Sequence, residues 1–183
     1  MTSTKKAAIT SLCIALCYVL PLVFHATASG ALFAPMHFPI LLCGLICGPF
    51  YGAFCGIAGP LVSSILSGMP AVARLIYFVP ETITYGLCTG LFMKWIRTGY
   101  LTRDLYCSLI PSMLLGRVVG GLSEALFYLS EMNQPFTIKL WAASYFVGST
   151  PGIILQLAIL PSLVIALERA KLIEKRYAKE ANK

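Results

Sequence analysis

Residues 33–70 read FAPMHFPILLCGLICGPFYGAFCGIAGPLVSSILSGMP, and this stretch decides which class of fold the chain can adopt. It is almost entirely apolar, yet five prolines and six glycines interrupt it, and His37 stands near its front. About 20 apolar residues in a helix span the hydrocarbon core of a bilayer, roughly 30 Å thick. The stretch therefore predicts short, interrupted helices inside a membrane, where non-helical backbone is tolerated only around a cavity.

The composition of the whole chain extends this interpretation. Of the 183 residues, 58% are hydrophobic and 11% charged, and the mean hydropathy is +0.81. Soluble domains are closer to half apolar and a quarter charged. Strands of a membrane barrel would alternate apolar and polar residues, which these runs do not. We expect an all-α integral membrane protein.

Six transmembrane helices account for the apolar runs, in a single domain of residues 1–183. The expected spans are residues 7–25, 36–48, 51–67, 74–95, 106–130 and 138–167. We expect a turn at Gly48-Pro49 and a break inside the third span at Gly59-Pro60. The connections are a loop of small residues at 26–35, a polar loop at 96–105 that contains the only aspartate, Asp104, and a loop at 131–137.

The basic residues predict the orientation. They flank the first span at Lys5 and Lys6, crowd the 96–105 loop, and fill the charged tail 168–183. With six spans, all three clusters fall on one side, which the positive-inside rule makes cytoplasmic. Both termini are therefore predicted to be cytoplasmic, and the net charge of +7 reflects topology rather than nucleic-acid binding.

The seven cysteines fit packing better than a metal site. Cys13 and Cys17 are four residues apart, as are Cys43 and Cys47, so each pair shares a helical face. No histidine or carboxylate is near enough in sequence to complete a metal site. We expect small apolar packing residues and no bound metal.

Five ionisable residues lie within the apolar region, where a charge is costly and usually faces a cavity or a partner. They are His37, Arg74, Glu81, Arg117 and Glu124. In the predicted orientation all five lie in the outer half or at the midplane, which suggests an outward-facing pocket. Gly120 and Gly121, between Arg117 and Glu124, would allow a ligand or another backbone to approach. Gln156 in the last span is a further candidate pocket donor.

Each candidate also has a purely structural interpretation. Arg117 and Glu124 could pair with each other or across helices, and Arg74 could extend to the outer interface. His37 could hydrogen-bond the preceding loop, and Gln156 could join two helices. Aromatic residues near the outer ends are interpreted as interface anchors rather than stacking platforms: Tyr128, Trp141 and Tyr145.

The first span carries a pattern of small residues. Ala7, Ser11 and Ala15 recur every four residues on one face, with Ala8 beside them. Small residues at this spacing let two membrane helices approach closely. The pattern predicts docking of this helix against another helix or subunit.

The layout and the 33–70 stretch resemble the substrate-binding S-components of energy-coupling factor (ECF) vitamin transporters, over essentially the whole chain. In this family a loop, a short second helix and a broken third helix follow one another, and the first helix usually shows Ala-xxx-Ala, where this chain has Ser11 and Ala15. The resemblance implies that a vitamin is captured outside and that the first helix docks onto a transmembrane T-component. The chain would then topple in the membrane, driven by two cytoplasmic ATPases. The chain has no GxxxxGK[ST] loop to bind ATP itself.

Two other function classes compete with this interpretation. A membrane enzyme would need paired acid–base or metal-binding groups, but the chain offers only His25, His37 and Asp104 besides its glutamates. An autonomous ion-coupled transporter would show internal repeats and a charged path through both halves, and neither is apparent. We expect no cofactor and a place in a prokaryotic plasma membrane. Among the substrates of the family, pantothenate suits Arg117 best, while queuosine, pyridoxine-type compounds and other vitamins stay open.

Overall fold

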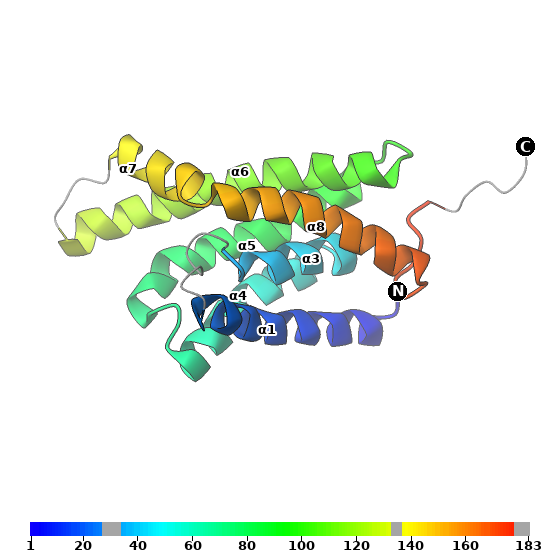
Figure 1. Ribbon diagram of the computed structural model, residues 1–183, viewed down its shortest axis with the longest axis horizontal. Helices are drawn as coiled ribbons and strands as arrows, with labels where there is room; N and C mark the ends of the chain where they lie inside the picture. Colours follow the sequence, from blue (N-terminus) through cyan, green and yellow to red (C-terminus); the bar gives the residue numbers. More distant parts are fainter. Residues whose placement is uncertain (27–33, 133–136, 178–183) are drawn as a thin grey trace, which may run out of the picture.

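The computed structural model describes residues 1–26, 34–132 and 137–177, and within these the secondary structure is entirely helical (Figure 1). The longer helices are α1 (Ser3–Ala26), α3 (His37–Cys47), α4 (Pro49–Ser67), α5 (Val72–Trp95), α6 (Leu101–Phe127) and α8 (Thr150–Arg169). Two short π-helices, Tyr128–Met132 and Ala143–Val147, and the short α7 (Ile138–Ala142) complete the described part. Most of the predicted loops 26–35 and 131–137 and the end of the tail lie outside the described residues.

Five helical segments are long and apolar enough to cross a membrane: Ser3–Phe24, Pro49–Ser67, Val72–Trp95, Leu101–Ser130 and Tyr145–Arg169. This confirms the predicted all-α membrane fold. The shorter α3 lies in the middle of the bundle, between the layer of α6 and α8 and the layer of α1 and α4 (Figure 1). It packs against α1, α4, α5 and α8, and every residue from Pro39 to Leu45 is buried.

The length of α3 fixes the depth of His37. Eleven residues rise only about 16 Å, half of a hydrocarbon core. The C-terminal end of α3 lies at the start of α1, since the Cys47 thiol is 3.7 Å from the Lys6 carbonyl oxygen. Gly48 then reverses the chain with φ +95°, a value that favours glycine, as the Gly48-Pro49 turn predicted. His37, at the other end of α3, therefore stands near the middle of the bundle.

The predicted break at Gly59-Pro60 is wrong: α4 runs through it as one helix from Pro49 to Ser67. A proline inside a helix leaves the carbonyl four residues earlier without its N–H partner. Here that carbonyl belongs to Gly56, and the Thr82 hydroxyl of α5 donates a hydrogen bond to it at 2.7 Å. The neighbouring helix thus replaces the missing donor, and α4 continues.

Close contact between α4 and α5 depends on glycine. A Cβ atom on Gly86 would lie 2.1 Å from the Gly52 carbonyl oxygen, a distance that no side chain tolerates. The two backbones therefore approach as small-residue interfaces do in membranes. This contact fixes the position of α5, which carries Glu81.

The predicted sixth span, residues 138–167, is not one continuous α-helix. α7 passes into the π-helix Ala143–Val147, a turn follows at Gly148-Ser149, and α8 begins at Thr150. Pro151 causes no break because it occupies the first turn of α8, where no N–H donor is required.

Five cysteines gather where α1, α3 and α4 meet, and all are buried: Cys13, Cys17, Cys43, Cys47 and Cys55. A Cβ on Gly59 would lie 2.7 Å from the Cys17 sulfur, so a small residue opposite this thiol is required. Among the described residues, no group of three potential ligands is arranged to hold a metal ion. The thiols occupy the core as the predicted packing residues.

Asp104 lies in the first turn of α6 and not in a polar loop, because α6 begins at Leu101. Its fully buried carboxylate accepts hydrogen bonds from Thr98, from Arg176 Nε at 2.7 Å and from the Tyr177 hydroxyl. Arg176 Nη2 also donates to the carbonyl oxygens of Met93 and Ile96 at the end of α5. The segment after α8 therefore folds back and ties together the ends of α5 and α6.

We expect Asp104→Asn to lower the free energy of unfolding by about 1.5 to 3 kcal/mol, the usual worth of hydrogen bonds to a charged group. The amide keeps the shape but removes the charge beside Arg176. Thermal unfolding in detergent would measure the loss. The matched control is Arg103→Ala, which removes an exposed neighbouring charge. Equal melting temperatures for Asp104→Asn and the wild type would contradict this role.

The topology gives a second test. A cysteine placed at Met69, between α4 and α5, should react with an impermeant thiol reagent added outside intact cells. A cysteine at Arg97, between α5 and α6, should react only after permeabilisation. Cys88 and Cys107 would first be replaced, since the other five cysteines are buried. Labelling of position 97 from outside would overturn the six-span arrangement with both termini inside.

Candidate ligand-binding site

A row of glycines on α6 forms one wall of the polar interior. A Cβ on Gly116 would lie 2.4 Å from the Tyr85 ring, and one on Gly120 would lie 2.8 Å from the Glu81 carboxylate. One on Gly121 would lie 2.1 Å from the Trp141 indole nitrogen. The row thus makes room for three large or charged side chains from α5 and α7. At Gly120 and Gly121 the space is taken by the side chains of Glu81 and Trp141, whereas the sequence predicted the approach of a ligand or another backbone.

Glu81 is buried and held by its own helix. Only 5% of its surface is exposed, and the Tyr85 hydroxyl, one turn later, donates to its Oε1 at 3.0 Å. Tyr85 is not among the predicted site residues, although its position four residues after Glu81 places both on one face. This hydrogen bond fixes one carboxylate oxygen toward α3.

His37 faces that same oxygen from the start of α3. Its Nε2 lies 3.4 Å from Glu81 Oε1, close enough for an ion pair if the ring is protonated, but the two atoms make no hydrogen bond. Nδ1 lies 3.3 Å from the Ala34 carbonyl oxygen, and the ring packs edge-on against Phe78 and Tyr85. Of two buried side-chain polar atoms without a hydrogen-bond partner in the described residues, His37 Nε2 is the one beside a carboxylate.

Gln156 of α8 reaches the same loop end. Its side chain is 2% exposed, and Nε2 donates to the Ala34 carbonyl oxygen at 3.4 Å. The residue therefore joins α8 to the segment that precedes α3, which agrees with its structural interpretation. It also fixes the backbone against which His37 is oriented.

Arg117 forms a second polar group next to the first. Its side chain is 6% exposed, and Nη1 donates to the Ser149 hydroxyl at 2.7 Å. The guanidinium lies over the Phe146 ring, 5.5 Å from its centroid. Among the described residues, no carboxylate lies within 4.0 Å of it, so the pair with Glu124 that was the structural alternative is not formed. The charge of Arg117 interacts electrostatically with the Tyr85 hydroxyl. Tyr85 therefore interacts with Arg117 as well as with the pair formed by Glu81 and His37.

The interrupted last span supplies the partners of Arg117 and Glu124. Trp141 Nε1 donates to the Arg117 carbonyl oxygen at 3.1 Å, and the side chains of Tyr145 and Glu124 interact. Both aromatic residues thus have polar partners inside the bundle, while their interpretation as interface anchors stays a prediction. Tyr128 is half-buried in the π-helix that follows α6.

Arg74 is the exception among the predicted site residues, because its side chain is exposed at the start of α5. It acts electrostatically on Tyr77 and Glu124 but makes no hydrogen bond or ion pair from its side chain among the described residues. It therefore lies at the margin of the polar cluster formed by His37, Glu81, Arg117 and Glu124. Exposure agrees with the interpretation that it extends toward the interface.

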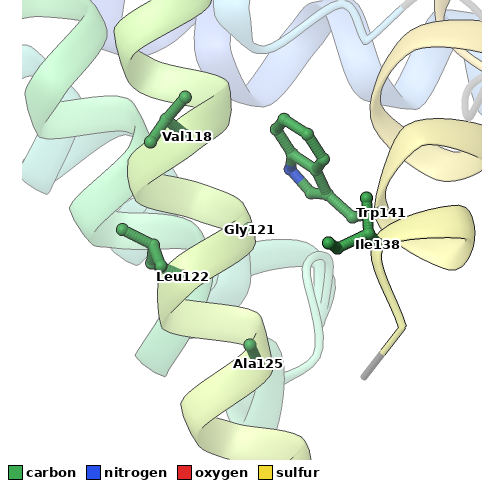
Figure 2. A pocket seen from close by; sticks show the side chains of 6 residues that line it. All are labelled: Val118, Gly121, Leu122, Ala125, Ile138 and Trp141. Atoms are coloured by element: carbon green, nitrogen blue, oxygen red, sulfur yellow. The ribbon is translucent and has the colours of Figure 1, made fainter. Parts of the chain in front are cut away.

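Two apolar cavities lie beside this cluster. One, of about 220 Å³, is lined by Val118, Gly121, Leu122 and Ala125 of α6 and by Ile138 and Trp141. Figure 2 shows the Trp141 indole reaching across it toward α6. The other, of about 150 Å³, lies between α1, α3 and α8 and contains Gln156 as its polar lining residue. Neither is lined by His37, Glu81 or Arg117.

The small-residue face of α1 is open. Ala7, Ser11 and Ala15 are all exposed, and the Ser11 hydroxyl donates to the Ala7 carbonyl oxygen at 3.0 Å. This bond turns the only polar group of the face back onto its own helix. The face therefore presents only small side chains, and its hydroxyl group is already hydrogen-bonded within α1.

Taken together, the cluster can bind and orient but offers little chemistry. It contains one guanidinium with a single hydroxyl partner, one carboxylate that accepts from Tyr85, a second carboxylate that interacts with Tyr145, and one imidazole nitrogen without a hydrogen-bond partner. Residues 5–167 match the family described as ECF transporter, substrate-specific component. No curated protein and no solved structure is significantly similar to the chain.

Proposed function

The chain belongs to the family of ECF transporter substrate-specific components, and from this premise we propose that it captures a small water-soluble vitamin or vitamin precursor, with pantothenate as the leading candidate. Membership makes it a multi-pass membrane protein of a transporter, with a small-molecule substrate and partners of the T-component and ATPase type. We further propose a single domain of residues 1–183 with both termini cytoplasmic, in a prokaryotic plasma membrane. The substrate would enter from the outer side.

The observation that carries the choice of ligand is the state of Arg117. A guanidinium has five N–H donors, and this one donates to the Ser149 hydroxyl alone among the described residues. A buried cation without a counter-ion is costly in a membrane interior. A ligand carboxylate would supply the missing charge and accept two parallel hydrogen bonds, the geometry that arginine favours. Pantothenate carries such a group.

The other predicted residues would complete the site. Glu81 and His37 would contact the part of the ligand away from Arg117, and Gln156 would hold the backbone next to His37. Glu124, which interacts with Tyr145, would lie on the side of the cluster nearest exposed Arg74. Ala7, Ser11 and Ala15 would form the docking face for the T-component. The chain itself would not catalyse a reaction.

Mass spectrometry of the small molecule that copurifies with the detergent-solubilised chain tests this proposal, together with calorimetric titration of pantothenate. We expect a bound acid, and ATPase subunits should copurify when the transporter is expressed whole. An autonomous ion-coupled transporter would instead move its substrate in vesicles that lack ATPases. A chain that binds pantothenate in none of these preparations would exclude it as the substrate.

A further inference from the structure

We propose that the ligand must carry a hydroxyl or N–H donor at the end opposite its carboxylate, and that His37 and Glu81 together select this donor. The inference rests on the proposed function and names a substrate class within it. Its basis is the unpartnered nitrogen of His37, which is independent of Arg117. The donor of the ligand would be bound by His37 of α3 and Glu81 of α5. Its carboxylate would be bound by Arg117 of α6, next to the turn at Ser149.

The contact with Ala34 determines which ring nitrogen of His37 carries a hydrogen. The Ala34 carbonyl oxygen can only accept, so the contact at 3.3 Å requires the hydrogen on Nδ1. In a neutral imidazole the other nitrogen, Nε2, then carries a lone pair. That lone pair faces Glu81 Oε1 at 3.4 Å, and the two atoms are both acceptors.

Among the described residues, no other side chain donates a hydrogen bond to His37 Nε2. Tyr85 donates to Glu81 Oε1, but its single hydroxyl hydrogen is then used. Gln156 Nε2 donates to the Ala34 carbonyl oxygen and not to His37. A buried acceptor without a donor costs free energy, and the cost is recovered when a ligand provides one. One donor placed beside the pair can serve Nε2 and Oε1 together.

The two requirements define a class of molecule. An anionic oxygen belongs at Arg117, and a hydroxyl or N–H belongs at the His37–Glu81 pair. Simple fatty acids meet the first requirement only, and uncharged polyols meet the second only. An acid whose other end bears hydroxyl groups, as in pantothenate, meets both.

The test uses the purified full-length chain and two probes in calorimetric titrations. The probes are pantothenate and its analogue in which hydrogen replaces both hydroxyl groups. We expect the wild type to prefer pantothenate by about tenfold to a hundredfold, the usual worth of a hydrogen bond to a charged group. In Glu81→Gln an amide nitrogen at the Oε1 position can donate one hydrogen to His37 Nε2 and the other to the Tyr85 hydroxyl oxygen. The preference should then fall to about onefold, with no loss of fold.

Glu124→Gln is the matched control, because it neutralises the other carboxylate of the cluster without touching His37. It should change the affinity for both probes alike and keep their ratio. Equal binding of both probes by the wild type would overturn the inference, and would indicate that a proton alone satisfies the pair. A preference that persists in Glu81→Gln would overturn it as well. A wild type that binds neither probe would instead refute pantothenate as the substrate, and this inference with it.

Discussion

Arg117→Ala should weaken pantothenate binding by about 30-fold to several thousandfold, the range found when one partner of a buried charge pair is removed. The guanidinium is nearly buried, donates to Ser149 and lies over Phe146, so it is held in place before the ligand arrives. Arg117→Lys keeps the charge but loses the planar pair of donors and the contact with the Phe146 ring. It should cost about tenfold to a hundredfold. Calorimetric titration of the purified variants would measure both.

The matched control is Arg97→Ala, which removes an exposed arginine between α5 and α6. It should leave binding unchanged. Arg117→Ala should also be examined by thermal unfolding, because a loss of fold would mimic a loss of binding, whereas Arg117→Lys should retain the wild-type melting temperature. Unchanged affinity in Arg117→Lys would make Arg117 a structural cation, and the carboxylate contact would have to move toward Arg74 and His37.

The membrane fold could be predicted from the sequence because it depends on summed hydropathy and on the spacing of apolar runs. The continuity of a helix through a proline could not be predicted, because it depends on which side chain the neighbouring helix supplies. Pro60 predicts a break when α4 is considered alone, and only the Thr82 hydroxyl of α5 removes it by satisfying Gly56. The polar residues around Asp104 likewise predict a loop when this segment is considered alone. A carboxylate at a helix start is acceptable in the core only because Arg176, 72 residues later, returns to it.

The candidate site was predicted in part. The rarity of charge inside an apolar chain singled out His37, Glu81, Arg117 and Glu124, and a contact between His37 and Glu81 is present. Their partners are hydroxyl and aromatic side chains, which occur throughout membrane helices and carry no signal alone: Tyr85, Trp141, Tyr145 and Ser149. Their positions depend on the short length of α3, the glycine row of α6 and the π-helix before Ser149.

The same contacts separate binding from docking. The polar cluster is built from α3, α5, α6 and the residues before α8, whereas the small-residue face belongs to α1. α1 packs on α3 and α4 through its buried side, which includes Cys13 and Cys17. Its other side, with Ala7, Ser11 and Ala15, is exposed in the described part of the chain and can therefore contact a partner. A change on this side should leave the ligand site intact.

Ala15→Trp should abolish uptake and leave pantothenate affinity within about twofold of the wild type. Small residues let helices approach closely, and an indole on this face would hold the partner helix away. Ala15 is exposed, so the position has room for the indole on the outside of the bundle. Uptake would be measured in cells that express the whole transporter, and affinity with the purified variant. Copurification of the T-component should be lost in parallel with uptake.

Leu126→Trp is the control for added bulk, since Leu126 is 68% exposed on α6, away from the small-residue face. It should dock and transport as the wild type does. Ala15→Gly adds no bulk and should also retain transport, which separates a steric effect from a loss of the methyl group. If Ala15→Trp lost ligand binding together with uptake, α1 would belong to the site or to the folding core. If it transported normally, the T-component would have to dock elsewhere, and the exposed apolar side of α4, with Phe54, Leu61 and Ile65, would be the next face to test.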